Sequence, residues 1–458
     1  MEQLPASLLY FTSQLQNFVR NTVKLNTLNT QTLASNGATQ LRVALPVNAV
    51  ASMKSLSMYC DMSTKGRAAS GGQVAVNALI PRNGPIACFD RVSVSAGGIA
   101  LDNGVTPYHV VYQMRQNLLS GNQKVMSDDK VLQQSVLRSE TGALGQTANY
   151  PAGHNAADTE DLSQQGQKQS FIVNNFAGFT ECHPEYLDLS LLPQVFVTIQ
   201  IANASVLPLQ QASTNLGDDI TSTLTDGMSY ALKNIHFTLD VCQIGSGMYS
   251  ALTERVLAER GSIDIPYPQF TIFRQDSSSA SSSIRGSVSC MSLDRVTGFM
   301  RNTDGPTSYQ LNQKPVKAED AVGSKFSNHA DTFISQGVRD YQLTINNSPI
   351  PTYRPTPLQA FNYVVCADDR TYSRSRGGSV ASQPQWLNNC WCAHHRLCFD
   401  NDISRISGTN VSSVNAQISF QTYGDGTGNA DKSREVAVMT EQTSILRCGA
   451  GRSCAVVA

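Results

Sequence analysis

The densest group of side chains capable of chemistry lies in residues 390–398, which read Cys-Trp-Cys-Ala-His-His-Arg-Leu-Cys. Thiolates and imidazoles are the ligands that zinc prefers, which makes Cys390, Cys392, His394 and Cys398 the candidate ligands. A Cys-x-Cys pair on a strand, however, sends both thiols to one face and lacks the reverse turn that Cys-x-x-Cys supplies. We therefore expect buried or edge-strand thiols here and no metal site.

A second pair of thiols, Cys448 and Cys454, flanks a Gly-Ala-Gly-Arg-Ser segment near the C-terminus. The pair is compatible with a disulfide or with chelation, but free thiols on a flexible terminus are the simpler expectation. The chain has 11 cysteines, an odd number, without the spacing of a disulfide framework. Such a set suits a reducing compartment, where thiols stay free.

Other catalytic patterns are weak or missing. Glycines at 424, 426 and 428 followed by Lys432 and Ser433 faintly resemble a phosphate-binding loop, but no glycine directly precedes the lysine and the context is a strand. The sequence contains neither a Gly-x-Ser-x-Gly elbow nor a His-Glu-x-x-His motif. We expect no enzyme activity and no cofactor.

The composition favours a protein with much of its surface in contacts. Only 15% of the 458 residues are charged, against a usual share of about 25%. A surface with few charges loses less hydration energy when a neighbour covers it. The net charge is −1, and the first 35 residues carry only Glu2, Arg20 and Lys24 as charged groups. With no basic arm to neutralise phosphates, direct nucleic-acid binding is not expected.

The start of the chain has no positively charged and apolar secretion signal, and no window approaches a membrane-spanning length of apolar residues. We expect a soluble, cytosolic chain. Its length of 458 residues fits two domains of roughly 200 residues each.

Alternation of apolar and polar residues is the dominant pattern, as in residues 195–201, 235–241 and 414–420. Such segments predict antiparallel strands, with turn formers such as Gly97-Gly98 between them. Further predicted strands are residues 40–47, 53–60, 74–79, 89–95, 170–176, 263–273, 285–291 and 436–445. Helical periodicity is confined to residues 8–19, 105–119, 247–260 and 357–365, too few for a parallel α/β sheet. The N-terminal helix would pack on its own domain or dock on a partner or a membrane surface.

A weak internal repeat appears when the chain is shifted by 251 residues. Val92 then falls on Leu343, and Tyr112 falls on Tyr363. Each copy reads as a strand, a turn, a short apolar piece and a short helix. Polar segments 120–168 and 366–389 follow the two copies, so both are expected to emerge at the same end of their domains.

These observations predict an all-β chain of two tandem eight-stranded antiparallel jelly-roll sandwiches with a few short helices. We expect an N-terminal arm or helix at 1–37, a first jelly roll at 38–245, a second at 246–447 that starts with a linking helix, and a C-terminal tail at 448–458.

The sequence resembles the double jelly-roll major capsid proteins of eukaryotic double-stranded DNA viruses, the lineage of virophages, polinton-like viruses and large DNA viruses. The segments that carry the resemblance are residues 186–193 leading into 195–201, residues 230–241 followed by Tyr249 and a helix, residues 287–299, and residues 341–351. The resemblance implies a homotrimeric, pseudo-hexagonal capsomer that tiles an icosahedral virion shell.

The implied partners are neighbouring capsomers, penton and minor capsid proteins, and an internal membrane contacted through the N-terminal segment. The implied location is the virion capsid, assembled inside the host cell. The alternative is a carbohydrate-binding or cell-surface β-sandwich protein, which shares the fold class. That alternative would normally bring a secretion signal and clustered loop aromatics. A metal enzyme on a double barrel is a third reading, which the seven scattered histidines disfavour.

Overall fold

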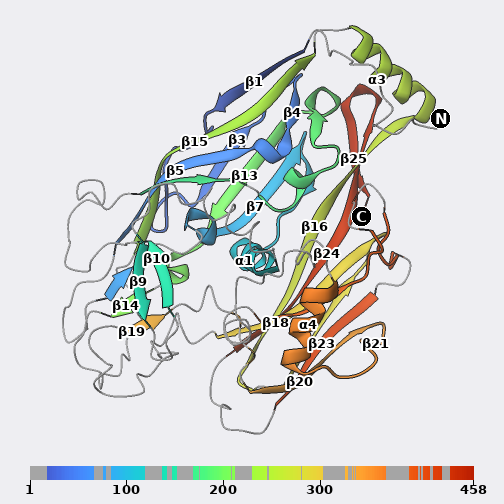
Figure 1. The fold of residues 1–458 in the computed structure, drawn as a ribbon. Helices are drawn as coiled ribbons and strands as arrows, with labels where there is room; N and C mark the ends of the chain where they lie inside the picture. The colour runs from blue at the N-terminus through green and yellow to red at the C-terminus, as the bar shows by residue number, and fades with distance from the viewer. Residues whose placement is uncertain are drawn as a thin grey trace, which may run out of the picture.

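The computed structural model describes most of the chain from Phe18 to Val457, and Figure 1 shows its arrangement. The described residues are 18–65, 76–78, 84–118, 137–141, 147–151, 169–174, 176–207, 209–211, 229–244, 247–279, 281–302, 325–327, 333, 335, 337–367, 391–400, 403, 406–412, 416–424 and 434–457. No helix within these ranges is both long and apolar enough to cross a membrane.

The first sandwich consists of two antiparallel sheets. Its first sheet has the order β11-β5-β15-β4-β12, with β1 and β2 also paired to β15, and its second has the order β3-β13-β7-β8. The strands are β1 (Phe18–Leu25), β2 (Leu33–Ala34), β3 (Gln40–Ala44), β4 (Val50–Ser52), β5 (Ser57–Lys65), β7 (Phe89–Ala96), β8 (Ile99–Asp102), β11 (Gln169–Val173), β12 (Tyr186–Asp188), β13 (Val195–Ile201) and β15 (Ser229–Ile244).

The second sandwich repeats this plan. Its sheets have the orders β16-β24-β18-β22 and β17-β23-β20-β21, and β25 adds to β24. The strands are β16 (Ser262–Ser277), β17 (Ser282–Val288), β18 (Leu293–Asn302), β20 (Val338–Ile345), β21 (Ser348–Ile350), β22 (Ala393–Arg396), β23 (Ala416–Gly424), β24 (Arg434–Gly449) and β25 (Ser453–Val457).

Smaller elements complete the fold. The remaining strands are β6 (Val76–Ala78), β9 (Leu137–Thr141), β10 (Thr147–Pro151), β14 (Leu209–Gln211) and β19 (Lys325–Ser327). The α-helices are α1 (Tyr108–Leu118), α3 (Gly247–Arg260) and α4 (Pro357–Ala367). The short 3-10 helices are η2 (Met53–Ser55), η3 (Gly84–Cys88), η4 (Phe179–Glu181), η5 (Leu189–Leu191), η6 (Ala204–Val206) and η9 (Ala450–Arg452). The predicted helices at 105–119, 247–260 and 357–365 are therefore confirmed.

The two sandwiches have equivalent strands in the same chain order. In one sheet β16, β24, β18 and β22 correspond to β1, β15, β5 and β11; in the other β17, β23, β20 and β21 correspond to β3, β13, β7 and β8. This is an eight-stranded antiparallel plan twice over, which confirms the predicted fold class.

The internal repeat is real as an order of elements, although the equivalent turns and helices are 249 residues apart rather than the predicted 251. Strands β7 and β8 are joined through Gly97 and Gly98, while β20 and β21 are joined through Asn346 and Asn347. All four residues have positive φ, which a tight two-residue hairpin turn requires and which Gly and Asn tolerate best. Each hairpin is followed by a helix, α1 or α4, as the shifted alignment predicted.

Two terminal expectations need correction. Most of the predicted N-terminal helix at 8–19 lies outside the described residues, but Phe18 and Val19 begin β1, whose eight residues all pair with β15. This strand hydrogen-bonds along its whole length to its neighbour, so the first sheet begins within the expected arm. The expected flexible tail at 448–458 is also wrong, because β25 pairs with the end of β24.

Candidate functional site: the junction between the two sandwiches

The helix α1 and the 3-10 helix η4 of the first sandwich pack against β16 of the second. In Figure 1 α1 lies between the two sandwiches. Phe179 of η4 meets Tyr267 of β16 edge to face, with ring centroids 5.1 Å apart. The Tyr267 hydroxyl donates to the main-chain oxygen of Leu101, and the amide of His183 donates to the oxygen of Pro266 at 2.9 Å. Aromatic packing and main-chain hydrogen bonds thus fix the orientation of the two sandwiches.

An arginine carries charge into this junction. Arg115 of α1 donates from Nη2 to Glu181 Oε1 at 3.0 Å, and its guanidinium lies 5.0 Å from the ring centroid of Phe270 on β16. Burial alone lowers the pKa of Arg115, but the carboxylates of Glu181 and Glu441 outweigh it and hold the pKa above its ordinary value. Because Glu441 belongs to β24, the arginine interacts with both sandwiches.

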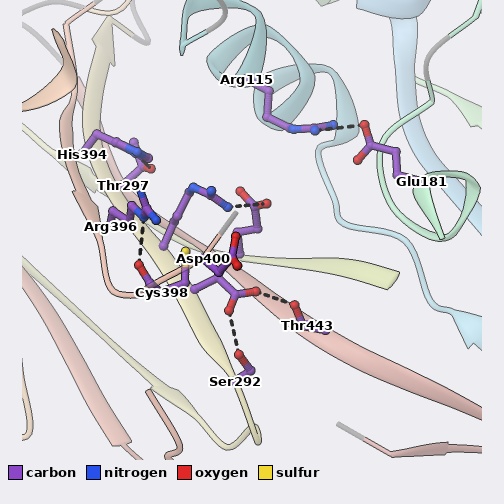
Figure 2. Close-up of polar contacts among 12 residues, drawn as sticks. Arg115, Glu181, Ser292, Thr297, His394, Arg396, Cys398, Asp400 and Thr443 are labelled. Carbon is purple, nitrogen blue, oxygen red and sulfur yellow. Dashed lines mark hydrogen bonds and ion pairs between the residues drawn. The ribbon is translucent and has the colours of Figure 1, made fainter. Parts of the chain in front are cut away.

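The second sandwich contributes a buried ion pair to the same face. Arg295 on β18 and Glu441 on β24 are directly opposed in the sheet, and Nη1 lies 3.0 Å from Oε1. Neighbouring Asp294 accepts hydrogen bonds from Ser292 at 2.7 Å and from Thr443 at 2.6 Å. Figure 2 shows Ser292 and Thr443 in this group and Arg115 pointing towards Glu181. Burial raises the pKa of Asp294 although both hydroxyls favour its charged form.

A second buried carboxylate supports the η4 turn. Asp102 at the end of β8 accepts from the amides of Gly104 at 2.8 Å and Phe179 at 3.1 Å. Gly178 has a φ of +102°, and a Cβ there would lie 2.2 Å from Asp102 Oδ2. Glycine is therefore required at this position both by the backbone conformation and by the close approach of the carboxylate.

The C-terminal hairpin of the second sandwich also contacts the first sandwich. The guanidinium of Arg452 donates to Asn48 Oδ1 of the first sandwich at 2.5 Å. Strand β25 lies against β8, and η9 lies against η5. Cys448 and Cys454 are directly opposed in this hairpin, and both are free thiols. The terminal segment is thus part of the contact between the sandwiches.

The candidate metal ligands that the structure describes, Cys392, His394 and Cys398, lie on or beside β22. Cys390 lies outside the described residues. His394 is buried and its Nδ1 lies 2.9 Å from Thr297 Oγ1, as Figure 2 shows. Cys392 and Cys398 are buried and take part in no disulfide, and burial raises the pKa of Cys398. Within the described residues no three His, Cys, Asp or Glu side chains group as metal ligands.

The chemistry of the junction is that of a structural contact. Its charged groups are paired with one another and its carboxylates accept hydrogen bonds, so the arrangement stabilises one orientation of the sandwiches. Sequence reasoning missed Arg115, Asp102, Arg295 and Glu441. The available signal was charge inside a strand pattern: in a chain with 15% charged residues, Arg295 and Glu441 interrupt apolar strands.

Comparisons with known proteins add a decisive observation. No family model and no curated protein sequence matches the chain. Among solved structures, the PBCV-1 protein VP54, fitted into a reconstruction of the virophage Sputnik, superposes with a TM-score of 0.59 at 10% identity over 99% of both chains. The fold is the double jelly roll of viral major capsid proteins.

Two other structures agree with this fold. The Faustovirus major capsid protein has a TM-score of 0.59 at 10% identity, covering 95% of this chain and 91% of its own. A chain of the Sputnik virophage structure has a TM-score of 0.51 at 10% identity, covering 100% of this chain and 92% of its own. The double jelly roll thus accounts for nearly the entire chain, including the junction. No comparison favours the carbohydrate-binding alternative.

Proposed function

We propose that this chain is the major capsid protein of a double-stranded DNA virus and acts as a structural tile rather than as an enzyme. Two equivalent sandwiches that pack against each other within one chain are the observation that carries the proposal. A subunit of a shell must keep its shape when neighbouring subunits contact it. The Phe179–Tyr267 contact and the hydrogen bond from His183 to Pro266 join the two sandwiches directly.

The proposed assembly is a homotrimer with a pseudo-hexagonal outline. Three chains with two similar sandwiches each present six similar units around one axis, so a cyclic trimer fits a hexagonal lattice. Stable contacts of this kind bury roughly 2,000 to 5,000 Å². Contacts between trimers are weaker individually and act together in the shell. The low charge of the chain suits such extensive burial.

The remaining elements of the proposal follow from this role. We keep the jelly-roll division at 38–245 and 246–447 as its working description, although β1 and β25 extend the sandwiches beyond it. The partners are neighbouring capsomers in an icosahedral shell, penton and minor capsid proteins, and an internal membrane contacted through the N-terminal segment. The chain is placed in the virion, with assembly inside the host cell. Nucleic acid is not expected to be a direct partner.

Purified full-length chain tests the proposal. Sedimentation velocity is expected to give a trimer, and negative-stain images are expected to show threefold particles with a hexagonal outline. A monomer that persists at high concentration and binds immobilised glycans would support the carbohydrate-binding alternative instead.

A further inference from the structure

The junction within one chain is formed by two different surfaces, one from each sandwich, and each surface has an equivalent on the other sandwich. The first sandwich contributes α1, β8 and the connection between β11 and β13, which contains η4. The second contributes β16 and β24. Because the sandwiches are equivalent, the second also owns a copy of the first side: α4, β21 and the connection between β22 and β23. The first sandwich owns a copy of the other side in β1 and β15.

The surface of the second sandwich formed by α4, β21 and the connection between β22 and β23 is apolar and exposed. Every large apolar side chain that is exposed in the described part of that sandwich lies in this region: Tyr353, Leu358, Phe399 and Ile406. Its equivalent on the first sandwich is covered: His109 and Tyr112 of α1 are buried, whereas Leu358 and Phe361 at the same positions of α4 are exposed and half-buried, and Phe179 is also buried. One chain therefore buries one copy of this surface and leaves the other open.

Phe399 is the most prominent residue of the open surface, with 92% of its area exposed. Like Phe179, it lies in the connection that follows the β11 or β22 strand. Its turn, residues 397–400, is held by the Arg396 guanidinium, whose Nε donates to the oxygen of Cys398 at 2.8 Å and Nη2 to that of Phe399 at 2.5 Å. The amides of Leu397 and Cys398 both donate to the oxygen of Asp294. The aromatic ring is thus presented on a fixed backbone.

The surface of the first sandwich formed by β1 and β15 is also exposed. Strand β16 has Ile265, Tyr267 and Phe270 buried, whereas residues 19–22 of its equivalent β1 are all exposed. Val19 of β1 is 61% exposed, and Leu28 just beyond the strand is also exposed. Isolated apolar residues are common on surfaces, but these lie where the equivalent strand receives a neighbouring sandwich.

We propose that Phe399 is the anchor by which the second sandwich of one copy docks on the β1 side of the first sandwich of a second copy. This inference rests on the proposed function and specifies its contact. The contact between copies repeats the contact within a chain, with Phe399 in the role of Phe179. Such a contact joins two different surfaces, so it continues beyond a dimer, and it closes into a ring when each copy is rotated by the 120° of the proposed trimer, about one third of a turn.

The test compares three substitutions in the full-length chain, with assembly followed by sedimentation and mass photometry over a concentration series. Phe399→Asp and Val19→Asp, placed on the two surfaces, are each expected to raise the concentration for half assembly by about thirtyfold or more, the effect of losing an interface anchor. Phe399→Leu is expected to retain assembly, because an apolar side chain remains.

Val47→Asp is the matched control. Val47 is 43% exposed but lies beside Asn48, which already contacts the C-terminal hairpin, and belongs to neither proposed surface. It is expected to assemble like wild type. All variants should melt at the wild-type temperature when compared at a concentration below that of assembly, because association itself stabilises the folded chain. If Phe399→Asp forms trimers at the same concentration as wild type, this inference is overturned and the proposed function is not. A wild-type chain that stays monomeric would overturn the proposed trimer and this inference with it.

Discussion

Arg295 and Glu441 face each other across neighbouring strands β18 and β24, with Nη1 and Oε1 3.0 Å apart and side-chain exposures of only 5% and 9%. Removing one partner of such a pair leaves a buried charge without compensation. We expect Glu441→Gln to lower the free energy of unfolding by about 3 kcal/mol, measured by urea titration.

The exposed pair Arg447–Asp264 is a matched control, because it also joins directly opposed strand residues, with side-chain exposures of 50% and 44%. Asp264→Asn is expected to change the free energy of unfolding by less than about 1 kcal/mol. Equal effects of the two substitutions would show that burial does not distinguish the pairs.

Gly178 offers a second test of the junction. Gly178→Ala places a Cβ 2.2 Å from Asp102 Oδ2 at a φ of +102°, so we expect a loss of stability of about 2 kcal/mol or more. Gly98→Ala is the control, because its φ is also positive, at +88°, but a Cβ there meets nothing within 4 Å. Calorimetric melting should rank Gly178→Ala clearly below Gly98→Ala, and the reverse order would contradict the close contact.

His395 makes the free energy of unfolding depend on pH. Burial, with a contribution from His394, holds the pKa of His395 at about 4, below its ordinary 6.5. Between these values the unfolded chain binds the proton and the folded chain does not, so this contribution to stability falls as pH drops from 6.5 to 4. The full loss is on the order of 3 kcal/mol.

The His395→Gln variant isolates this effect. Asp102 and Asp294 act in the opposite sense, because burial raises their pKa values and protonation favours the folded chain. The difference between wild type and His395→Gln in unfolding free energy should therefore shrink or change sign as pH falls from 7 to 4.5. Parallel profiles for the two proteins would exclude His395 as a source of the pH dependence.

We expect Cys448 and Cys454 to form a disulfide when the protein is oxidised. They are directly opposed in the β24–β25 hairpin, and such Cα atoms lie about 4.5 to 5.5 Å apart, within the range that a disulfide bridges. Burial raises the pKa of Cys448 to about 12, so the reaction with diamide is expected to be slow near neutral pH. Peptide mapping should find this bridge in wild type and lose it in Cys454→Ser; bridges elsewhere would argue against the hairpin register.

Much of the fold follows from sequence alone. Alternation in residues 195–201 and 235–241 locates β13 and the centre of β15, and the 251-residue shift comes within two residues of aligning two hairpins whose turns require Gly or Asn. Local patterns suffice for these elements, since each is specified by residues near in sequence.

The junction between the sandwiches cannot be predicted from such local patterns. Alternation shows that a strand has two faces but not that a second domain covers the outer one, so Arg295 and Glu441 look like solvated charges. In residues 390–398 the sequence predicts buried thiols but not the neighbours that tertiary packing provides, such as the Thr297 hydroxyl beside His394. Strand β1 was missed because within Phe18–Leu25 only Val23 and Leu25 alternate with polar residues, and its pairing with β15 is not visible in the sequence.

Electron cryomicroscopy of the assembled full-length protein tests the central claim most directly. The account predicts three chains around one axis, with six similar sandwiches in alternating order and Phe399 of each chain buried against β1 of the next. A monomer, or an assembly whose sandwiches are not arranged as six similar units, would contradict it.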